Sequence, residues 1–121
     1  MDRVERIRSL LMRFNTSTPN IEGSAVISND GLMIASLLSS DFEEERVGAM
    51  AAAILSLGES SSQEMQRGEL RQAYVEGSNG YMILQRASSE TLLLALTTKK
   101  AKLGLVFLDV DRLANSISEI L

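Results

Sequence analysis

The sequence predicts one small domain of the α/β class, spanning residues 1–121, in the order helix, two strands, helix, three strands, helix. Three observations lead to this prediction. The length fits a single domain. In three segments apolar residues recur every three or four positions, as they do on one face of a helix. Short apolar runs between these segments end in Gly, Asn, Asp or Ser, which are the usual residues of turns between strands.

The first expected helix spans residues 2–15. Asp2 is followed three residues later by Glu5, which is the spacing of a capping box at a helix start. The only proline, Pro19, is expected to lie beyond the end of this helix. Its apolar stripe is formed by Val4, Ile7, Leu11 and Phe14, widened by Leu10.

Two strands, 22–28 and 32–37, are expected around the turn Asn29-Asp30-Gly31. Asn and Asp tolerate tight turns, and Gly31 can adopt the left-handed conformation that a three-residue hairpin loop with a bulge requires. An alternative is that Asp30 is a catalytic acid. The turn interpretation is favoured, because the turn itself requires these residue types.

Three further strands are expected at 69–76, 80–86 and 91–97, followed by a helix at about 100–120. The strand 91–97 is apolar on both faces, so it is expected at the centre of the sheet. The strand 69–76 is polar and mixed, so it is expected at an edge. The apolar stripe of the last helix comprises Leu103, Val106, Phe107, Val110, Leu113, Ile117 and Ile120.

The chain contains no cysteine and no histidine. This excludes disulfides, zinc sites built on those residues, and nucleophiles activated by histidine. An all-oxygen metal site stays open, with Glu43, Glu44 and Glu45 as candidate ligands. Consecutive helical positions point in different directions, so these carboxylates are better explained as charges that favour the positive end of a helix dipole. We expect no cofactor and no catalysis by the chain itself.

The net charge of −4 and an aromatic content of 4% make nucleic acid a poor partner. The basic cluster of Lys99, Lys100 and Lys102 is interpreted either as a solvated loop or as a partner contact. The N-terminus lacks the apolar stretch of a signal peptide. The longest apolar run, 49–55, is far below the roughly 20 residues of a membrane span. We therefore expect a cytoplasmic protein without membrane insertion.

The helix expected at 42–67 carries more apolar and small surface than one buried stripe requires. Asp41 is its expected N-cap. Gly48, Ala52 and Ser56 are spaced four apart and form a ridge with almost no side chains. A helical glycine costs about 1 kcal/mol relative to alanine, so close approach of another backbone would explain Gly48. Either a second copy packs against this ridge, or the helix lies tightly on its own sheet.

The same helix directly precedes the expected edge strand 69–76. If two copies of the helix pack together, the edge strands come close, and their unpaired backbone groups can join the sheets about a two-fold axis. Self-association is therefore the expected property of this region. The predicted dimer interface comprises Val47, Gly48, Met50, Ala51, Ile54, Leu57, Arg71, Ala73, Tyr74 and Val75.

Several stretches of the chain resemble the Roadblock/LC7 family, and within it the prokaryotic MglB-like proteins. They are Gly23–Ser28 running into Asp30–Ala35, the Ala-rich helix at 43–67, Gly80–Leu84, and Lys102–Val106 followed by an amphipathic helix. The resemblance covers nearly the whole chain. It implies one antiparallel five-stranded sheet related to the profilin-like and longin folds, with the central helix on one face and the terminal helices on the other.

The resemblance also implies a function. Family members dimerise through the central helix and the following strand into a ten-stranded sheet, and they serve as scaffolds and as regulators of Ras-like small GTPases. MglB-like proteins activate GTP hydrolysis. Many of them extend beyond the last helix, whereas this sequence stops at Leu121, so contacts made by such a tail are not expected.

Four functions can be compared on this basis. The first is a homodimeric regulator or adaptor of a Ras-like small GTPase, and the second is a structural scaffold in a dynein-type or signalling-type complex. A small-ligand sensor is less favoured because the expected interior is aliphatic. An enzyme is least favoured because the serines and carboxylates show no pairing pattern. Arginines of the right type to assist a GTPase are Arg46, Arg67, Arg71, Arg86 and Arg112, although repositioning of its switch loops would need none.

Overall fold

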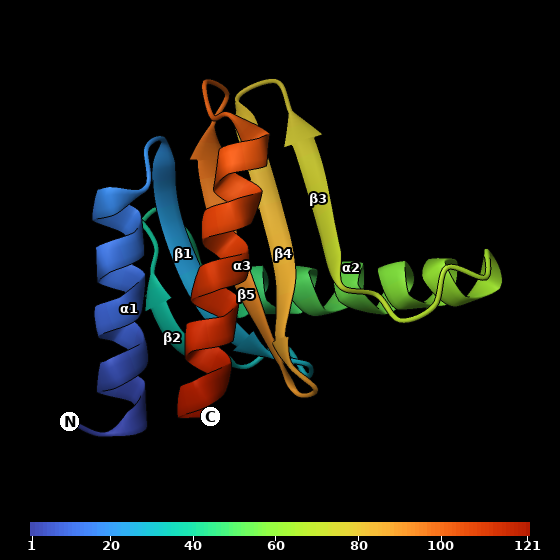
Figure 1. Cartoon of the computed structure of the whole chain (residues 1–121), viewed down its shortest axis with the longest axis horizontal. Coiled ribbons are helices and arrows are strands. Elements are labelled where there is room, and N and C mark those ends of the chain that lie inside the picture. Colours follow the sequence, from blue (N-terminus) through green and yellow to red (C-terminus); the bar gives the residue numbers. More distant parts are fainter.

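In the computed structural model, which describes residues 1–121, three helices and five strands follow the predicted order. The elements are α1 (Arg3–Ser17), β1 (Ile21–Ser28), β2 (Met33–Leu37), α2 (Glu44–Glu64), β3 (Gln72–Gly77), β4 (Gly80–Ser88), β5 (Thr91–Thr98) and α3 (Leu103–Ile120). The strands form one antiparallel sheet in the order β2-β1-β5-β4-β3. Helices α1 and α3 cover one face, and α2 crosses the other (Figure 1). The predicted fold class is confirmed.

Strand β5 is central and β3 is an edge strand, as predicted. Alternate residues of β5 enter two separate cores. Leu93 and Ala95 face α1 and α3, whereas Leu92 and Leu94 face α2. This burial on both faces explains the uninterrupted apolar run Leu92–Leu96.

The larger core lies between the sheet and the two terminal helices. The helices contribute Ile7, Leu11, Phe14, Val106, Val110, Leu113, Ala114 and Ile117. These residues confirm most of the predicted stripes, while Val4 lies outside the core and is exposed. No helix is long and apolar enough to cross a membrane.

The helix starts test the predicted caps. Asp2 caps α1, and its Oδ1 accepts a hydrogen bond from the Glu5 amide at 2.8 Å. The prediction that Asp41 caps α2 was wrong. The N-cap is Glu43, whose side chain makes no capping hydrogen bond. A turn precedes the helix, in which the Asp41 amide donates to Ser39 Oγ at 3.3 Å, and this turn places Asp41 too early in the chain to cap.

Helix α2 also ends earlier than predicted. Gln66 adopts a left-handed conformation, with a φ of 58°. Its amide donates to the Gln63 carbonyl at 3.0 Å, and the Arg67 amide donates to the Ser62 carbonyl at 2.6 Å. This pair of bonds is a Schellman motif, in which glycine usually takes the left-handed position. Because glutamine occupies it here, the residue pattern carries no sign of the stop, and β3 begins later than predicted as a result.

Candidate self-association surface

The inner face of α2 lies on the sheet of its own chain. Val47, Ala51 and Leu55 are buried there, spaced one helical turn apart. The start of the helix meets the β1–β2 turn at two glycines. A Cβ on Gly48 would lie 2.1 Å from the Gly31 carbonyl oxygen, far inside van der Waals contact. Gly31 has a φ of 86°, the left-handed conformation predicted for this turn.

The backbone that approaches Gly48 is therefore that of the same chain. Gly58 has a similar explanation, because a Cβ there would lie 2.9 Å from Cδ2 of Leu70. The ridge of Gly48, Ala52 and Ser56 could be explained by a second copy or by tight packing of the helix on its own sheet. These contacts support the packing on its own sheet. The two glycines set how closely α2 approaches the hairpin turn and the segment before β3.

The outer face of α2 carries a second line of apolar residues. Met50, Ala53 and Leu57 are exposed and lie at positions i, i+3 and i+7, which places them along one side of the helix. We call these three residues the outer stripe. Met50 is 48% exposed and Leu57 is 70% exposed. A continuous apolar line on the solvent side of a helix is typical of a contact surface.

The second part of the surface is the free edge of β3. This strand pairs only with β4, and α2 extends past this edge of the sheet (Figure 1). The Arg86 amide donates to the Arg71 carbonyl, so Arg71 faces β4. Backbone groups alternate in direction along a strand, so Gln72, Tyr74 and Glu76 direct their N–H and C=O groups away from the sheet. No other strand of the chain pairs with them.

The side chains of β3 are divided between the two faces of the sheet. Ala73 and Val75 pair with residues whose side chains face α2, so their own side chains lie on that face of the sheet. Tyr74 points to the opposite face, where its ring centroid lies 5.5 Å from that of Phe107 on α3. Tyr74 is 52% exposed and Val75 is 47% exposed. The edge therefore presents apolar surface on both faces together with free backbone groups.

One carboxylate at this edge is held in place by a phenol. The Tyr81 hydroxyl of β4 donates a hydrogen bond to Glu76 Oε2 at 3.3 Å. Desolvation and the neighbouring Glu76 carboxylate raise the pKa of the Tyr81 phenol above its usual value. A tyrosine phenol is protonated at neutral pH even without this shift, so the Tyr81 hydroxyl is a hydrogen-bond donor there.

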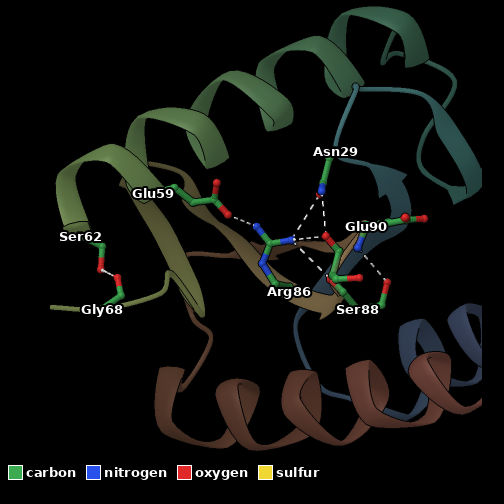
Figure 2. A network of polar contacts seen from close by, with 8 residues as sticks. Asn29, Glu59, Ser62, Gly68, Arg86, Ser88 and Glu90 are labelled. Carbon is green, nitrogen blue, oxygen red and sulfur yellow. Dashed lines mark hydrogen bonds and ion pairs between the residues drawn. The ribbon is translucent and has the colours of Figure 1, made fainter. Parts of the chain in front are cut away.

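A polar network ties α2 to the ends of the strands. Arg86 of β4 forms an ion pair with Glu59 of α2. Its Nη1 also donates to Asn29 Oδ1 at 3.3 Å and to the Ser89 carbonyl at 3.2 Å (Figure 2). The Asn29 side-chain amide donates to the same carbonyl at 2.9 Å. One guanidinium group thus links the β1–β2 and β4–β5 turns to the second half of α2.

The Roadblock/LC7 domain model matches residues 8–97. The chain belongs to the Roadblock/LC7 family. Two uncharacterized proteins of Methanocaldococcus jannaschii, MJ0310 and MJ1340, are similar to this Roadblock/LC7 domain. Each is 38% identical to it over 92% of this chain and 96% of the relative.

Solved structures share the fold of this Roadblock/LC7 domain. A Roadblock/LC7 domain from Streptomyces avermitilis gives a TM-score of 0.86 at 24% identity, covering 93% of this chain and 94% of the other. Myxococcus xanthus MglB gives a TM-score of 0.90 at 14% identity, covering 99% and 90%. Profilin II from Acanthamoeba castellanii gives 0.66 at 17% identity, covering 93% and 96%. The expected relation to the profilin-like fold is confirmed.

The residues predicted for the dimer interface divide into two groups in this Roadblock/LC7 domain. Val47, Gly48 and Ala51 are covered by the chain's own sheet and hairpin turn. The others are exposed or half-buried, namely Met50, Ile54, Leu57, Arg71, Ala73, Tyr74 and Val75. Ala53, which the prediction did not include, has the helical spacing from Met50 and Leu57 that places it in the outer stripe.

The arginines considered as aids to a GTPase have diverse settings. Arg86 is already engaged by Glu59 and the hairpin turns. Arg46 and Arg112 each lie 3.9 Å from a carboxylate one turn away on their own helix. The Arg67 Nε donates to a backbone carbonyl at 3.0 Å, and Arg71 is exposed. The contacts of Arg46, Arg67, Arg86 and Arg112 are all with groups of their own chain.

The largest cavity of the Roadblock/LC7 domain, about 580 Å³, lies at the start of β3 beside α3. Polar and charged residues make up most of its lining. Gln72 Nε2 donates to Gln85 Oε1 at 2.7 Å, and Gln85 Nε2 donates to Asp111 Oδ1 at 3.4 Å. Small-ligand pockets are mostly apolar with a few convergent polar groups. A hollow whose polar groups bond to one another does not favour a ligand sensor.

Proposed function

We propose that this Roadblock/LC7 domain is a homodimer that regulates a Ras-like small GTPase by binding it, without catalysis of its own. The proposal is carried by two features that nothing in this chain covers, the outer stripe of α2 and the free edge of β3, past which α2 extends (Figure 1). A second copy covers both at once, because a two-fold axis brings like surfaces together.

The free edge favours one register between the two copies. Tyr74 is the middle one of the three β3 residues whose backbone groups point outward. If Tyr74 lies opposite Tyr74 of the second copy, Gln72 lies opposite Glu76 on both sides. All three outward residues of each copy then form hydrogen-bonded pairs, with two bonds in each pair. A shifted register would leave some of these backbone groups without a partner.

The same register also covers apolar side chains. On the α2 face of the joined sheet, Ala73 of one copy lies opposite Val75 of the other. The two α2 helices project over these pairs, and their outer stripes face each other. On the opposite face, two Tyr74 rings meet beside Phe107. Aromatic pairs of this kind add about 0.5–1.5 kcal/mol beyond the burial of their area.

The choice of a GTPase as partner depends on the family. The resemblance to MglB-like proteins implies regulation of a Ras-like GTPase, and a shared fold with MglB over 99% of this chain is consistent with it. We assign the contact to the ends of the paired α2 helices, where two copies create a surface that neither has alone. Among the five candidate arginines, the one with the most contacts, Arg86, is bound within its own chain, so we propose that hydrolysis is stimulated through the GTPase's own switch loops.

The test is binding to a Ras-like GTPase encoded beside this protein, loaded either with a GTP analogue or with GDP. We expect the GTP-bound form to bind at least tenfold more tightly, because switch loops differ between the two states. In single-turnover hydrolysis, Arg67→Ala, just after the end of α2 and outside the predicted dimer interface, should leave the stimulated rate within about twofold of the parent. Loss of a catalytic arginine costs about 10³-fold or more.

Equal binding of both nucleotide states would contradict the GTPase assignment and favour the second candidate, a scaffold subunit. That candidate uses the same dimer but is indifferent to the nucleotide. A large loss of rate on Arg67→Ala would instead retain the GTPase as partner and overturn the mechanism through its switch loops.

A further inference from the structure

The sheet has two edge strands, and they differ in how accessible their backbone groups are. At β3, nothing in the chain pairs with the outward groups of Gln72, Tyr74 and Glu76. At β2, helix α1 packs directly alongside the strand (Figure 1). An exposed edge can pair with another chain, so this difference bears on how many copies can join.

The direction of the β2 carbonyls follows from one contact. The Leu37 carbonyl oxygen lies 3.2 Å from the position of a Cβ on Gly23 of β1, so this carbonyl faces β1. Neighbouring carbonyls along a strand point in opposite directions. The Ser36 carbonyl therefore points away from β1, along the free edge of the sheet. It is an acceptor that an incoming strand could use.

This acceptor is already occupied. Arg8 Nη1 of α1 donates a hydrogen bond to the Ser36 carbonyl oxygen at 3.1 Å. A guanidinium group at this place also brings a positive charge to the edge. If two β2 edges approached about a two-fold axis, the two Arg8 side chains would meet and repel each other.

A second polar contact holds helix α1 against β2. Asn15 lies seven residues after Arg8, which places both side chains on the same side of the helix. The Asn15 amide donates to the Leu37 carbonyl at 3.2 Å, and its oxygen accepts a bond from the buried Ser24 hydroxyl at 2.6 Å. Both polar atoms of the Asn15 side-chain amide are therefore hydrogen-bonded. These bonds fix the part of α1 that carries Arg8 beside β2.

The strand itself adds to the protection. Strand β2 has only five residues, and its pairing with β1 is interrupted by a bulge between Val26 and Ile27. Short and bulged edges are poor templates for a further strand. Strand β3 pairs with β4 in continuous register along its whole length. The edge strand with regular pairing, β3, is therefore the one whose outward backbone groups are free.

We infer that Arg8 closes the β2 edge, so that association of this protein through sheet edges stops at two copies. The inference extends the proposed dimer, in which the β3 edges of both copies are used up by pairing with each other. With β2 closed by α1, no edge remains to add a third copy, and the assembly is closed rather than open-ended.

The test compares Arg8→Ala with the parent protein by sedimentation velocity and light scattering over a wide range of concentration. The variant is expected to form species larger than two copies, with association through β2 roughly tenfold tighter than in the parent. Arg8→Lys, which keeps a donor and a positive charge at the edge, should restore the parent's mass. Arg6→Ala removes the same charge from an exposed position on the same helix and should have no effect.

A parent-like mass for Arg8→Ala would overturn the inference, and so would an equal increase with Arg6→Ala. A Tyr74→Pro background separates this result from the dimer proposal. Proline removes an outward N–H from the β3 edge and leaves the bonds to β4 intact. In that background Arg8→Ala should still associate through β2. The role of Arg8 is therefore tested even if the β3 dimer does not form.

Discussion

Replacing Gly48 with alanine is expected to lower the free energy of unfolding by about 2–3 kcal/mol. The new methyl group would lie 2.1 Å from the Gly31 carbonyl oxygen, which belongs to the backbone and cannot rotate away. Either α2 or the β1–β2 turn must move. Alanine is the better helix former by about 1 kcal/mol, but this gain is smaller than the strain. Urea unfolding monitored by circular dichroism measures the difference.

The matched control is Gly104→Ala in the first turn of α3. It is the same substitution in a helix, but no atom lies within 4 Å of the added Cβ. We expect unchanged or slightly increased stability. If Gly48→Ala were instead as stable as the parent and only its oligomeric state changed, the contact between α2 and the hairpin turn would be contradicted.

Replacing Leu57 with glutamate is expected to weaken the dimer by roughly 100-fold or more, because two carboxylates would face each other across the paired helices. Leu57 is 70% exposed in the single chain, so its own fold should be little affected. Sedimentation equilibrium gives the dissociation constant, and thermal unfolding of the resulting monomer tests the fold.

Leu105→Glu provides the comparison for that variant. Leu105 is 62% exposed, but it lies on α3, on the opposite face of the sheet from α2. The same change of charge and volume there should leave the dimer intact. Equal weakening by both variants would indicate a general effect of charge and would contradict the assignment of the outer stripe to the interface.

The order of elements and the position of β5 could be predicted because they depend on local patterns. A strand buried on both faces carries a continuous apolar run, and Leu92–Leu96 within β5 has this character. The end of α2 could not be predicted in the same way. The left-handed residue there is Gln66, and only the backbone reveals that it terminates the helix.

The surplus of apolar residues on α2 was visible in the sequence, but the division of its faces was not. Val47, Ala51 and Leu55 share one helical spacing, and the outer stripe has an equivalent spacing on the other side. Periodicity alone cannot say which stripe meets the sheet. The Gly48–Gly31 contact decides it, and that contact joins segments that are separate in the sequence.

The polar contacts that position the surface were also hidden from the sequence. Arg86 reaches Glu59 and Asn29 across long stretches of chain, and Arg8 reaches Ser36 in the same manner. Each arginine has the ordinary surroundings of a surface charge in its local sequence. Only the folded arrangement brings a guanidinium group to a strand edge or between two turns.

Pairing of β3 with β3 about Tyr74 is the central contact of the proposed dimer. Disulfide trapping tests it directly because the chain has no cysteine of its own. In the predicted register, Tyr74→Cys places two Cα atoms about 5.5 Å apart, within the range that a disulfide spans. Glu76→Cys places its two copies more than about 13 Å apart on the same strand edge. Under mild oxidation, Tyr74→Cys should convert to a covalent dimer while Glu76→Cys stays uncrosslinked. Equal crosslinking of both variants, or none with Tyr74→Cys, would contradict the proposed dimer.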